Sequence, residues 1–150
     1  MLRLSDNFKL YELVKSSTAD RLGIDNIPTT EVILNLERLC LRVLQQIRDW
    51  YELPVKVNSG FRCPKLNQAI GSSKKSQHLT GEAADIEIYG LDNLELACWI
   101  RDNLEFDQLI LEFYDGTPQS GWVHVSLKEH GNRNECLTIN KGTVKRGLVG

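Results

Sequence analysis

Three segments of the chain largely alternate between apolar and polar side chains, and this alternation constrains the fold more than any other feature of the sequence. The segments are residues 83–89, 106–113 and 121–127. Successive side chains of a β-strand point to opposite faces of the sheet, so a period of two predicts strands that bury only one face. The buried set is almost wholly apolar, as in Leu109 with Leu111 and Val123 with Val125. We therefore predict three strands that share one hydrophobic face.

The opposite face of these strands carries one chemically active side chain from each: Asp85, Glu112 and His124. If the second and third strands form a hairpin that is symmetric about Pro118, Glu112 lies directly opposite His124. Facing side chains have Cβ atoms about 4.5–5.5 Å apart. A carboxylate beside a metal-binding imidazole is well placed to act as a general base toward water. The alternation thus predicts a polar site on the face of the sheet away from the core.

Helical patterns account for most of the remaining chain. They predict helices over residues 5–16, from Thr29 or Thr30 to about Tyr51, over 64–70 and over 91–104. The first helix is expected to turn inward Phe8, Leu10 and Leu13. The longest helix has an apolar stripe with core-facing spacing, formed by Val32 or Ile33, Leu36, Leu39 or Cys40, Val43, Ile47 and Trp50. Short strands are expected over 55–58 and 136–139, and residues 17–28 are expected to be an irregular connection.

Together these elements predict an α+β fold, in which helices cover one face of a small, mainly antiparallel sheet. The 150 residues are enough for one domain, which we place over residues 1–150. A net charge of -2 gives no basic field, so nucleic-acid binding is not expected. No apolar run approaches the roughly 20 residues that cross a bilayer, and the N-terminal segment does not resemble a signal peptide. We expect synthesis in the cytoplasm, no membrane insertion and a monomer.

The cysteines give no sign of a structural zinc site. The four of them, at positions 40, 63, 98 and 136, form no closely spaced pair of the kind that binds structural zinc. Nothing indicates an oxidising compartment, so we expect four reduced thiols.

The candidate metal ligands are His78, Asp85 and His124. Two imidazoles and a carboxylate form the three-ligand set of an open catalytic zinc site, and imidazole is a poor ligand for magnesium or calcium. The third histidine of the chain, His130, lies in a polar run that is typical of a loop. Gly81 lets the chain turn, so that the loop histidine and the strand aspartate can converge. The alternative is a loop histidine and a strand-end carboxylate with no shared role.

Glu112 is the candidate general base, and its alternative is a solvated glutamate on a strand. Two other carboxylates compete with it. Asp115 precedes a glycine and is typical of a turn. Glu87 is on the same face but further along its strand, where it could orient a metal ligand.

Four further residues are candidates for substrate binding. Arg62 could bind a substrate carboxylate through its planar guanidinium, or could be an ordinary surface cation. Ser76 and Gln77 could hydrogen-bond the substrate or simply shape their loop. Trp122 is expected to form a wall of the cleft.

Three sequence blocks resemble a known family. They are Ser59-Gly60-Phe61-Arg62-Cys63-Pro64-Lys65-Leu66-Asn67, the pattern Ser76-x-His78-x-x-Gly81-x-Ala83-x-Asp85, and Gly121-Trp122-Val123-His124-Val125-Ser126. They resemble the zinc D-Ala-D-Ala carboxypeptidase family of metallopeptidases, in its compact single-domain form found in bacteriophages and bacteria. The resemblance implies a hedgehog/DD-peptidase fold, one zinc ion per chain at His78, Asp85 and His124, and a substrate-binding role for Arg62.

One position departs from this resemblance. Several relatives have the catalytic acid three residues before the last histidine ligand, where this chain has Gly121. Residues 106–112 instead resemble the hedgehog-type arrangement, in which a glutamate comes from the preceding strand. That arrangement implies Glu112 as the catalytic residue.

The activity that the resemblance implies is hydrolysis of peptidoglycan stem peptides. It favours a D-alanyl-D-alanine carboxypeptidase or endopeptidase that serves as a phage lysin or in wall remodelling. Such a protein would reach the wall after release through a holin or as part of a virion. The alternatives are an L-alanyl-D-glutamate endopeptidase on the same scaffold and a zinc-containing binding or structural module without catalysis.

Overall fold

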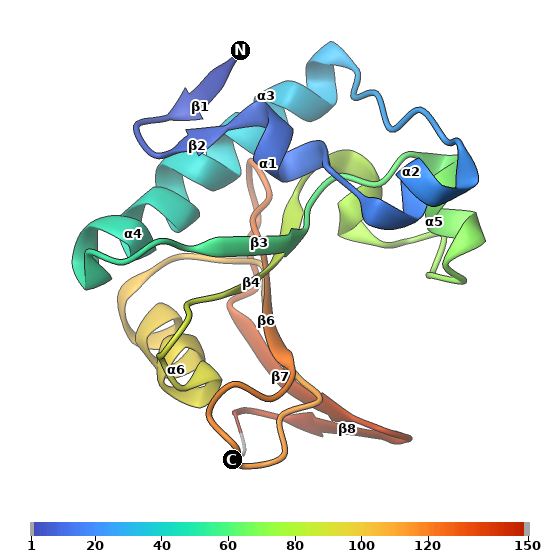
Figure 1. The fold of residues 1–150 in the computed structure, drawn as a ribbon. Coiled ribbons are helices and arrows are strands. Elements are labelled where there is room, and N and C mark those ends of the chain that lie inside the picture. Colours follow the sequence, from blue (N-terminus) through green and yellow to red (C-terminus); the bar gives the residue numbers. More distant parts are fainter. Residues whose placement is uncertain (1, 149–150) are drawn as a thin grey trace.

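A six-stranded sheet forms the centre of the computed structural model, which describes residues 2–148 (Figure 1). Its strands in spatial order are β3 (Lys56–Ser59), β4 (Ala83–Glu87), β6 (Trp122–Ser126), β5 (Gln108–Glu112), β7 (Glu135–Asn140) and β8 (Thr143–Arg146). All neighbours run antiparallel except β5 and β7, which are parallel. The predicted α+β class with a mainly antiparallel sheet is therefore confirmed. The exposed strand β8, which extends the sheet at one edge, was not predicted from the sequence.

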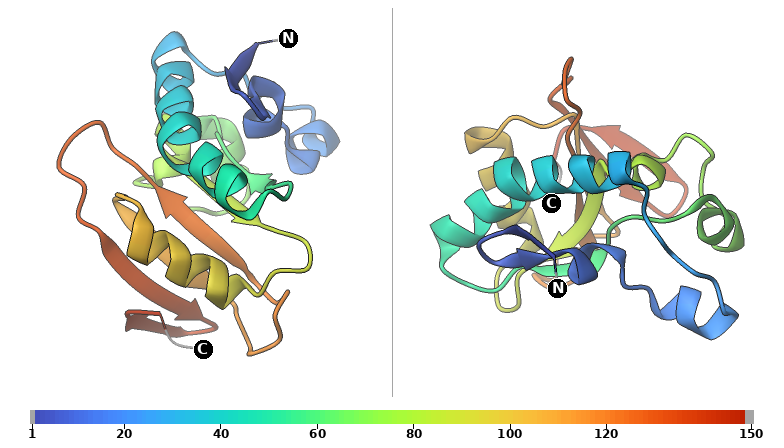
Figure 2. Two further views of the ribbon diagram at one scale, coloured as in Figure 1. Left: turned by 90° about the vertical axis from the view of Figure 1, so that its left-hand side faces the viewer. Right: turned by 90° about the horizontal axis from the view of Figure 1, so that it is seen from above.

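The helices that build the core lie against one face of this sheet. They are α3 (Thr30–Leu39), η1 (Cys40–Leu44) and α4 (Gln45–Tyr51), which form one long helix, and α6 (Asn93–Asn103). Figure 2 shows both helices on the same side of the strands. The core between the two layers includes Leu36, Val43 and Ile100 from the helices and Ile86, Leu111 and Val125 from the strands. Within residues 2–148, no helix is both long enough and apolar enough to cross a membrane.

The N-terminal segment differs from the prediction of one helix over residues 5–16. It forms a two-stranded hairpin of β1 (Arg3–Ser5) and β2 (Phe8–Lys9), followed by the short helix α1 (Leu10–Val14). Buried Gln45 holds the hairpin turn, because its Oε1 accepts hydrogen bonds from Ser5 Oγ at 2.8 Å and from Asn7 N at 2.9 Å. These long-range contacts outweigh the local helical pattern. Phe8 and Leu13 are nevertheless buried as predicted.

Residues 17–28 contain a helix, α2 (Ser17–Leu22), where an irregular connection was predicted. Its boundaries follow ordinary capping rules. Ser16 Oγ accepts a hydrogen bond from Ala19 N at 3.1 Å, and Gly23 ends the helix with a φ of 67°. The remaining short helices are α5 (Pro64–Ala69), where a helix was predicted, and η2 (Gln77–Thr80).

The long helix begins as predicted, with Thr29 Oγ1 accepting a hydrogen bond from Val32 N at 3.2 Å. Its middle, η1, is a π-helical segment. The wider turn shifts later side chains around the axis relative to a continuous α-helix. Ile47 remains buried, but Trp50 is 65% exposed, so the prediction that Trp50 lies in the core stripe is wrong.

Candidate metal centre

The three predicted ligands converge on the face of the sheet opposite the core helices. His78 comes from η2, Asp85 from β4 and His124 from β6, and Asp85 is paired directly with His124 in the antiparallel register. One ligand atom from each residue lies within 4.8 Å of the other two. All three side chains are buried and line a cavity of about 880 Å³. The structure thus brings together residues that are 46 positions apart at the extremes, from 78 to 124.

The spacing of these atoms suits a small metal ion. Asp85 Oδ1 lies 3.0 Å from His124 Nδ1, and Asp85 Oδ2 lies 3.5 Å from His78 Nε2. Metal–ligand bonds of about 2.0–2.2 Å in tetrahedral geometry place neighbouring ligand atoms about 3.3–3.6 Å apart. The observed distances are close to that range. The residues therefore fit a zinc ion, with a side of the site open toward the cavity.

Local contacts orient the imidazole of His78 for this role. Its Nδ1 donates a hydrogen bond to Gly60 O at 2.7 Å, which leaves the Nε2 lone pair directed toward Asp85. Ser76 Oγ accepts from His78 N at 3.2 Å and so caps η2. Gly81 ends η2 with a φ of 77°, and a Cβ there would lie 2.8 Å from atoms of Val32. A glycine is thus required where this loop passes over α3.

The electrostatics of the centre favour the protonation states that metal binding needs. Burial lowers the pKa of His78 and outweighs the opposing effect of Asp85, so the imidazole is neutral at pH 7. Burial works against ionisation of Asp85 too, but the hydrogen bond with His124 and the proximity of both imidazoles prevail and hold the pKa of that carboxyl well below its usual range. The centre therefore presents a neutral imidazole with a free lone pair at His78 and an ionised carboxylate at Asp85, both of which can bind a metal ion.

Glu112 is on the predicted face but not in the predicted register. It pairs with Trp122, while Ile110 lies opposite His124, so the prediction that Glu112 directly faces His124 is wrong. The hairpin is centred on Thr117 instead of Pro118, because side-chain hydrogen bonds close the turn early. Thr117 N donates to Asp115 Oδ1 at 2.9 Å, and Asp115 N donates to Ser120 Oγ at 3.0 Å. A shift of two residues keeps the same face, so Glu112 still lines the cavity, one diagonal step from His124.

Trp122 holds Glu112 in place. Its indole Nε1 donates a hydrogen bond to Glu112 Oε2 at 2.9 Å, and its ring contacts Phe113 with centroids 5.4 Å apart. Burial, and secondarily the charge of Asp85, raises the pKa of Glu112. Glu112 is thus a fixed carboxylate with elevated basicity beside the metal centre, which are the properties of a general base. The prediction that Trp122 lines the cleft agrees with its position, but its contact with Glu112 was not foreseen.

Gly121 explains why this chain has no acid three residues before the last histidine. Its φ is 63°, and a Cβ at this position would lie only 1.9 Å from Glu112 O and 2.6 Å from Phe113 C. No side chain can be accommodated there. The backbone of β5 therefore excludes a side chain at position 121, whatever residue stands at position 112.

We predict that Gly121→Ala destabilises the protein strongly. A non-glycine residue at positive φ costs about 1–3 kcal/mol, and the overlap with β5 adds to that cost. Gly142→Ala is the matched control, because Gly142 has a φ of 72° but no atom within 4 Å of the added Cβ. Chemical denaturation should show a larger loss of unfolding free energy for Gly121→Ala. Equal losses would show that the overlap is relieved without cost.

Arg62 lies in the same cavity as the metal ligands. Its Nε is buried without a hydrogen-bond partner, and no ion pair joins it to any residue within 2–148. Burial lowers its pKa, and the carboxylates of Asp85 and Glu112 oppose that effect. The alternative of an ordinary surface cation does not fit a half-buried guanidinium with an unsatisfied donor.

The other candidates have contacts within the protein. Ser76 and Gln77 line the cavity, but Ser76 also caps η2 and Gln77 Nε2 donates to Asp107 Oδ2 at 3.0 Å. Glu87 accepts a hydrogen bond from Asn58, and within residues 2–148 no hydrogen bond joins its side chain to a predicted metal ligand, while Asp115 belongs to the turn. The roles of Ser76 and Gln77 toward a substrate stay predictions.

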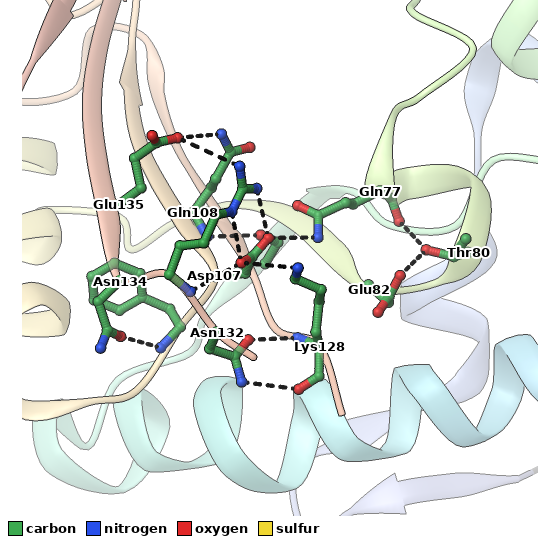
Figure 3. Close-up of polar contacts among 12 residues, drawn as sticks. Gln77, Thr80, Glu82, Asp107, Gln108, Lys128, Asn132, Asn134 and Glu135 are labelled. Carbon is green, nitrogen blue, oxygen red and sulfur yellow. Dashed lines mark hydrogen bonds and ion pairs between the residues drawn. The ribbon is translucent and has the colours of Figure 1, made fainter. Parts of the chain in front are cut away.

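Sequence reasoning missed Asp107, which lines the cavity and is fully buried. Arg133 pairs with it at 2.8 Å. Lys128 pairs with it at 3.7 Å, as Figure 3 shows. Burial opposes its ionisation, but hydrogen bonds from Arg133 and Gln77 lower the pKa of Asp107 to about 2. A signal existed: Asp107 continues the apolar set of Leu109 and Leu111, and a carboxylate on a core-facing position is rarely buried unless it is paired with a cation.

Comparison with known proteins places this geometry in a family. The Peptidase M15 family model matches residues 6–126, a span that includes all three predicted ligands and ends two residues after His124. The chain therefore belongs to the Peptidase M15 family, whose members are zinc metallopeptidases. The resemblance is confirmed at this level, while the compact carboxypeptidase branch remains a prediction. A comparison with curated proteins gave no match.

Proposed function

We propose that this chain is a zinc peptidase of the bacterial cell wall that removes the terminal D-alanine from stem peptides ending in D-Ala-D-Ala. The observation that carries this proposal is Arg62, whose guanidinium lies in the cavity with the predicted metal ligands, has a buried Nε without a hydrogen-bond partner and forms no ion pair within residues 2–148. A guanidinium binds a carboxylate through two parallel hydrogen bonds. Placed beside the reacting centre, it selects peptides whose free C-terminus is close to the bond that is cut. In this proposal the protein acts on the wall as a phage lysin or a wall-remodelling enzyme.

The residues that would hold the zinc ion are His78, Asp85 and His124. When bound there, zinc would supply Lewis acidity, which polarises the scissile carbonyl and makes a water molecule easier to deprotonate. Arg62 binds the terminal carboxylate and so fixes which carbonyl lies over the centre. Binding in this way reduces the entropy cost of reaching the reactive geometry.

Glu112 performs the proton transfers. Because Trp122 occupies Oε2, Oε1 is the atom that accepts a proton from the attacking water. The same carboxyl then donates that proton to the amine of the departing D-alanine, which restores the carboxylate. The raised pKa of Glu112 favours both transfers, since it makes the carboxylate a better base without making the acid too weak to donate.

The proposal is tested by incubating the zinc-loaded protein with purified peptidoglycan and with a pentapeptide ending in D-Ala-D-Ala, with and without a chelator. Mass spectrometry of the products should show chelator-sensitive loss of one D-alanine. Cleavage between L-alanine and D-glutamate would replace the proposal with the endopeptidase alternative. Bound zinc without any product would favour a non-catalytic module.

The role of Arg62 gives a sharper prediction. We expect Arg62→Met to raise KM for the free pentapeptide by about 10–100-fold, because a charge-assisted hydrogen-bonded contact of about 1.5–3 kcal/mol is lost. A pentapeptide with an amidated C-terminus should be a poor substrate for the wild type, and Arg62→Met should not change its KM. Arg38→Met is the control, since Arg38 pairs with Glu129 outside the cavity. A uniform loss on both peptides would instead indicate a structural role for Arg62.

A further inference from the structure

The cavity collects positive charge although the chain as a whole has a net charge of -2. Four cationic side chains line it, namely Arg62, Lys75, Lys128 and Arg133. The carboxylates that line it are Asp85, Asp107 and Glu112. Two of these carboxylates, Asp85 and Glu112, belong to the metal centre and its base. The third, Asp107, pairs with Lys128 and Arg133, and Glu135, which does not line the cavity, lies 3.9 Å from Arg133 Nη1.

Lys128 and Arg133 lie at a different end of the cavity from Arg62. The sheet sets the order along β5: Glu112 is paired with Trp122, Ile110 lies level with the ligand His124, and Gln108 begins the strand. Asp107 precedes Gln108 and pairs with Lys128 and Arg133, whereas the charges that act on Arg62 are those of Asp85 and Glu112. Arg62 thus lies at the end of the cavity near Glu112, whereas Lys128 and Arg133 form a second cationic group beyond Gln108.

Asp107 holds Lys128 and Arg133 in place but does not occupy all of their donor atoms. The carboxylate is fully buried, while the side chains of Lys128 and Arg133 are 39% and 50% exposed. Arg133 uses Nε and one terminal nitrogen on Asp107, at 3.0 and 2.8 Å, and its Nη1 lies 3.9 Å from Glu135, beyond hydrogen-bond distance. Lys128 Nζ lies 3.7 Å from Asp107, also beyond that distance. Both cations keep donors that point away from the buried carboxylate.

Gln77 adds an acceptor to this end of the cavity. Its Nε2 donates to Asp107, and its Oε1 is buried without a hydrogen-bond partner (Figure 3). A buried polar atom without a partner is rare in folded proteins and indicates a missing ligand or water. A peptide N–H would satisfy it.

We propose that Lys128 and Arg133 bind a second carboxylate of the peptide substrate, on the N-terminal side of the bond that is cut. This inference rests on the proposed function, because it assumes a peptide that lies along β5 and β6. On β5, Gln108 lies two residues before Ile110, which is level with His124. Lys128 follows His124 by four residues. These offsets correspond to distances along a strand of about 7 and 13 Å from the level of His124. An extended peptide covers these distances in two to four residues. The preferred substrate therefore carries an acidic residue two to four positions before the scissile bond.

The test compares peptides that end in D-Ala-D-Ala and carry either glutamate or glutamine at the second, third or fourth residue before the cut. For the wild type we expect kcat/KM to be about tenfold higher with glutamate at the best of these positions, and the difference to shrink as salt is added. Lys128→Met should reduce the preference to less than about twofold. Lys74→Met is the matched control, since Lys74 is exposed beside the cavity but does not line it, and it should keep the preference.

A binding measurement separates this inference from the proposed function. Zinc-loaded Glu112→Gln and its double variant with Lys128→Met are titrated with the same peptides by calorimetry. Equal binding of glutamate and glutamine peptides overturns the inference, even where the wild type cleaves both and the proposed function stands. Tighter binding of a glutamate peptide that depends on Lys128, without cleavage by the wild type, supports the inference and overturns the proposed function. Thermal unfolding of Lys128→Met checks that the fold is unchanged.

Discussion

Asp85→Ala is expected to lose the metal and the activity together. Asp85 lies within 3.5 Å of both other predicted ligands, and its carboxylate provides the negative charge of the set. Changing a residue behind a metal ligand typically weakens metal affinity about 10–100-fold, so removal of the ligand itself should exceed that range. Elemental analysis after dialysis against buffered free zinc should give about one zinc per chain for the wild type and almost none for Asp85→Ala.

Glu87→Ala is the control for this substitution. Glu87 is on the same strand and the same face, but it pairs with Asn58 and is not part of the ligand set. It should therefore retain zinc. Stoichiometric zinc in Asp85→Ala, or loss of zinc in Glu87→Ala, would contradict the assignment of the centre.

The same centre should contribute to stability. A ligand that binds only the folded state stabilises it by RT ln(1 + [L]/Kd), which is about 4 kcal/mol at a free concentration of 1,000 Kd. A chelator should accordingly lower the Tm of the wild type and leave that of Asp85→Ala unchanged. The two results together distinguish loss of the metal from loss of the fold.

The parts of the fold that the sequence predicted are those set by local alternation and capping. The strand faces followed from a period of two, which placed Asp85 and His124 on one side and their apolar neighbours on the other. The N-cap at Thr29 followed from one side-chain hydrogen bond. Such features depend on a few neighbouring residues, so the sequence alone is enough to predict them.

The parts that the sequence did not predict depend on contacts between distant segments. The β1–β2 hairpin exists because Gln45, about 40 residues away, binds its turn. The buried position of Asp107 requires Arg133 from the loop before β7. The exposure of Trp50 results from a π-helical turn that has no reliable local signature. No window of neighbouring residues contains this information.

The register between β5 and β6 lies between these two cases. A turn symmetric about Pro118 was a reasonable assumption, but side chains inside the loop decided the outcome through Asp115 and Ser120. The prediction of the catalytic face survived only because the error was two residues. An error of one residue would have moved Glu112 to the core face.

Glu112→Gln is expected to reduce kcat by about 10²–10⁴-fold, which is the usual contribution of a general acid–base residue. Glutamine has nearly the same shape, and its amide oxygen can still accept the hydrogen bond from Trp122. It cannot take a proton from water or return one to the leaving amine. Because it replaces neither a ligand nor a buried cation, zinc content and Tm should match the wild type, and KM should change little.

Trp122→Phe provides the comparison that separates chemistry from orientation. It keeps an aromatic ring against Phe113 but removes the indole donor that fixes Glu112. We expect a loss of roughly tenfold in kcat, because the carboxylate can still exchange protons but is held less firmly. The double variant should have the same kcat as Glu112→Gln alone, because the orientation of the side chain matters only when it can transfer a proton. Additive losses in the double variant would mean that Trp122 acts on the substrate independently of Glu112.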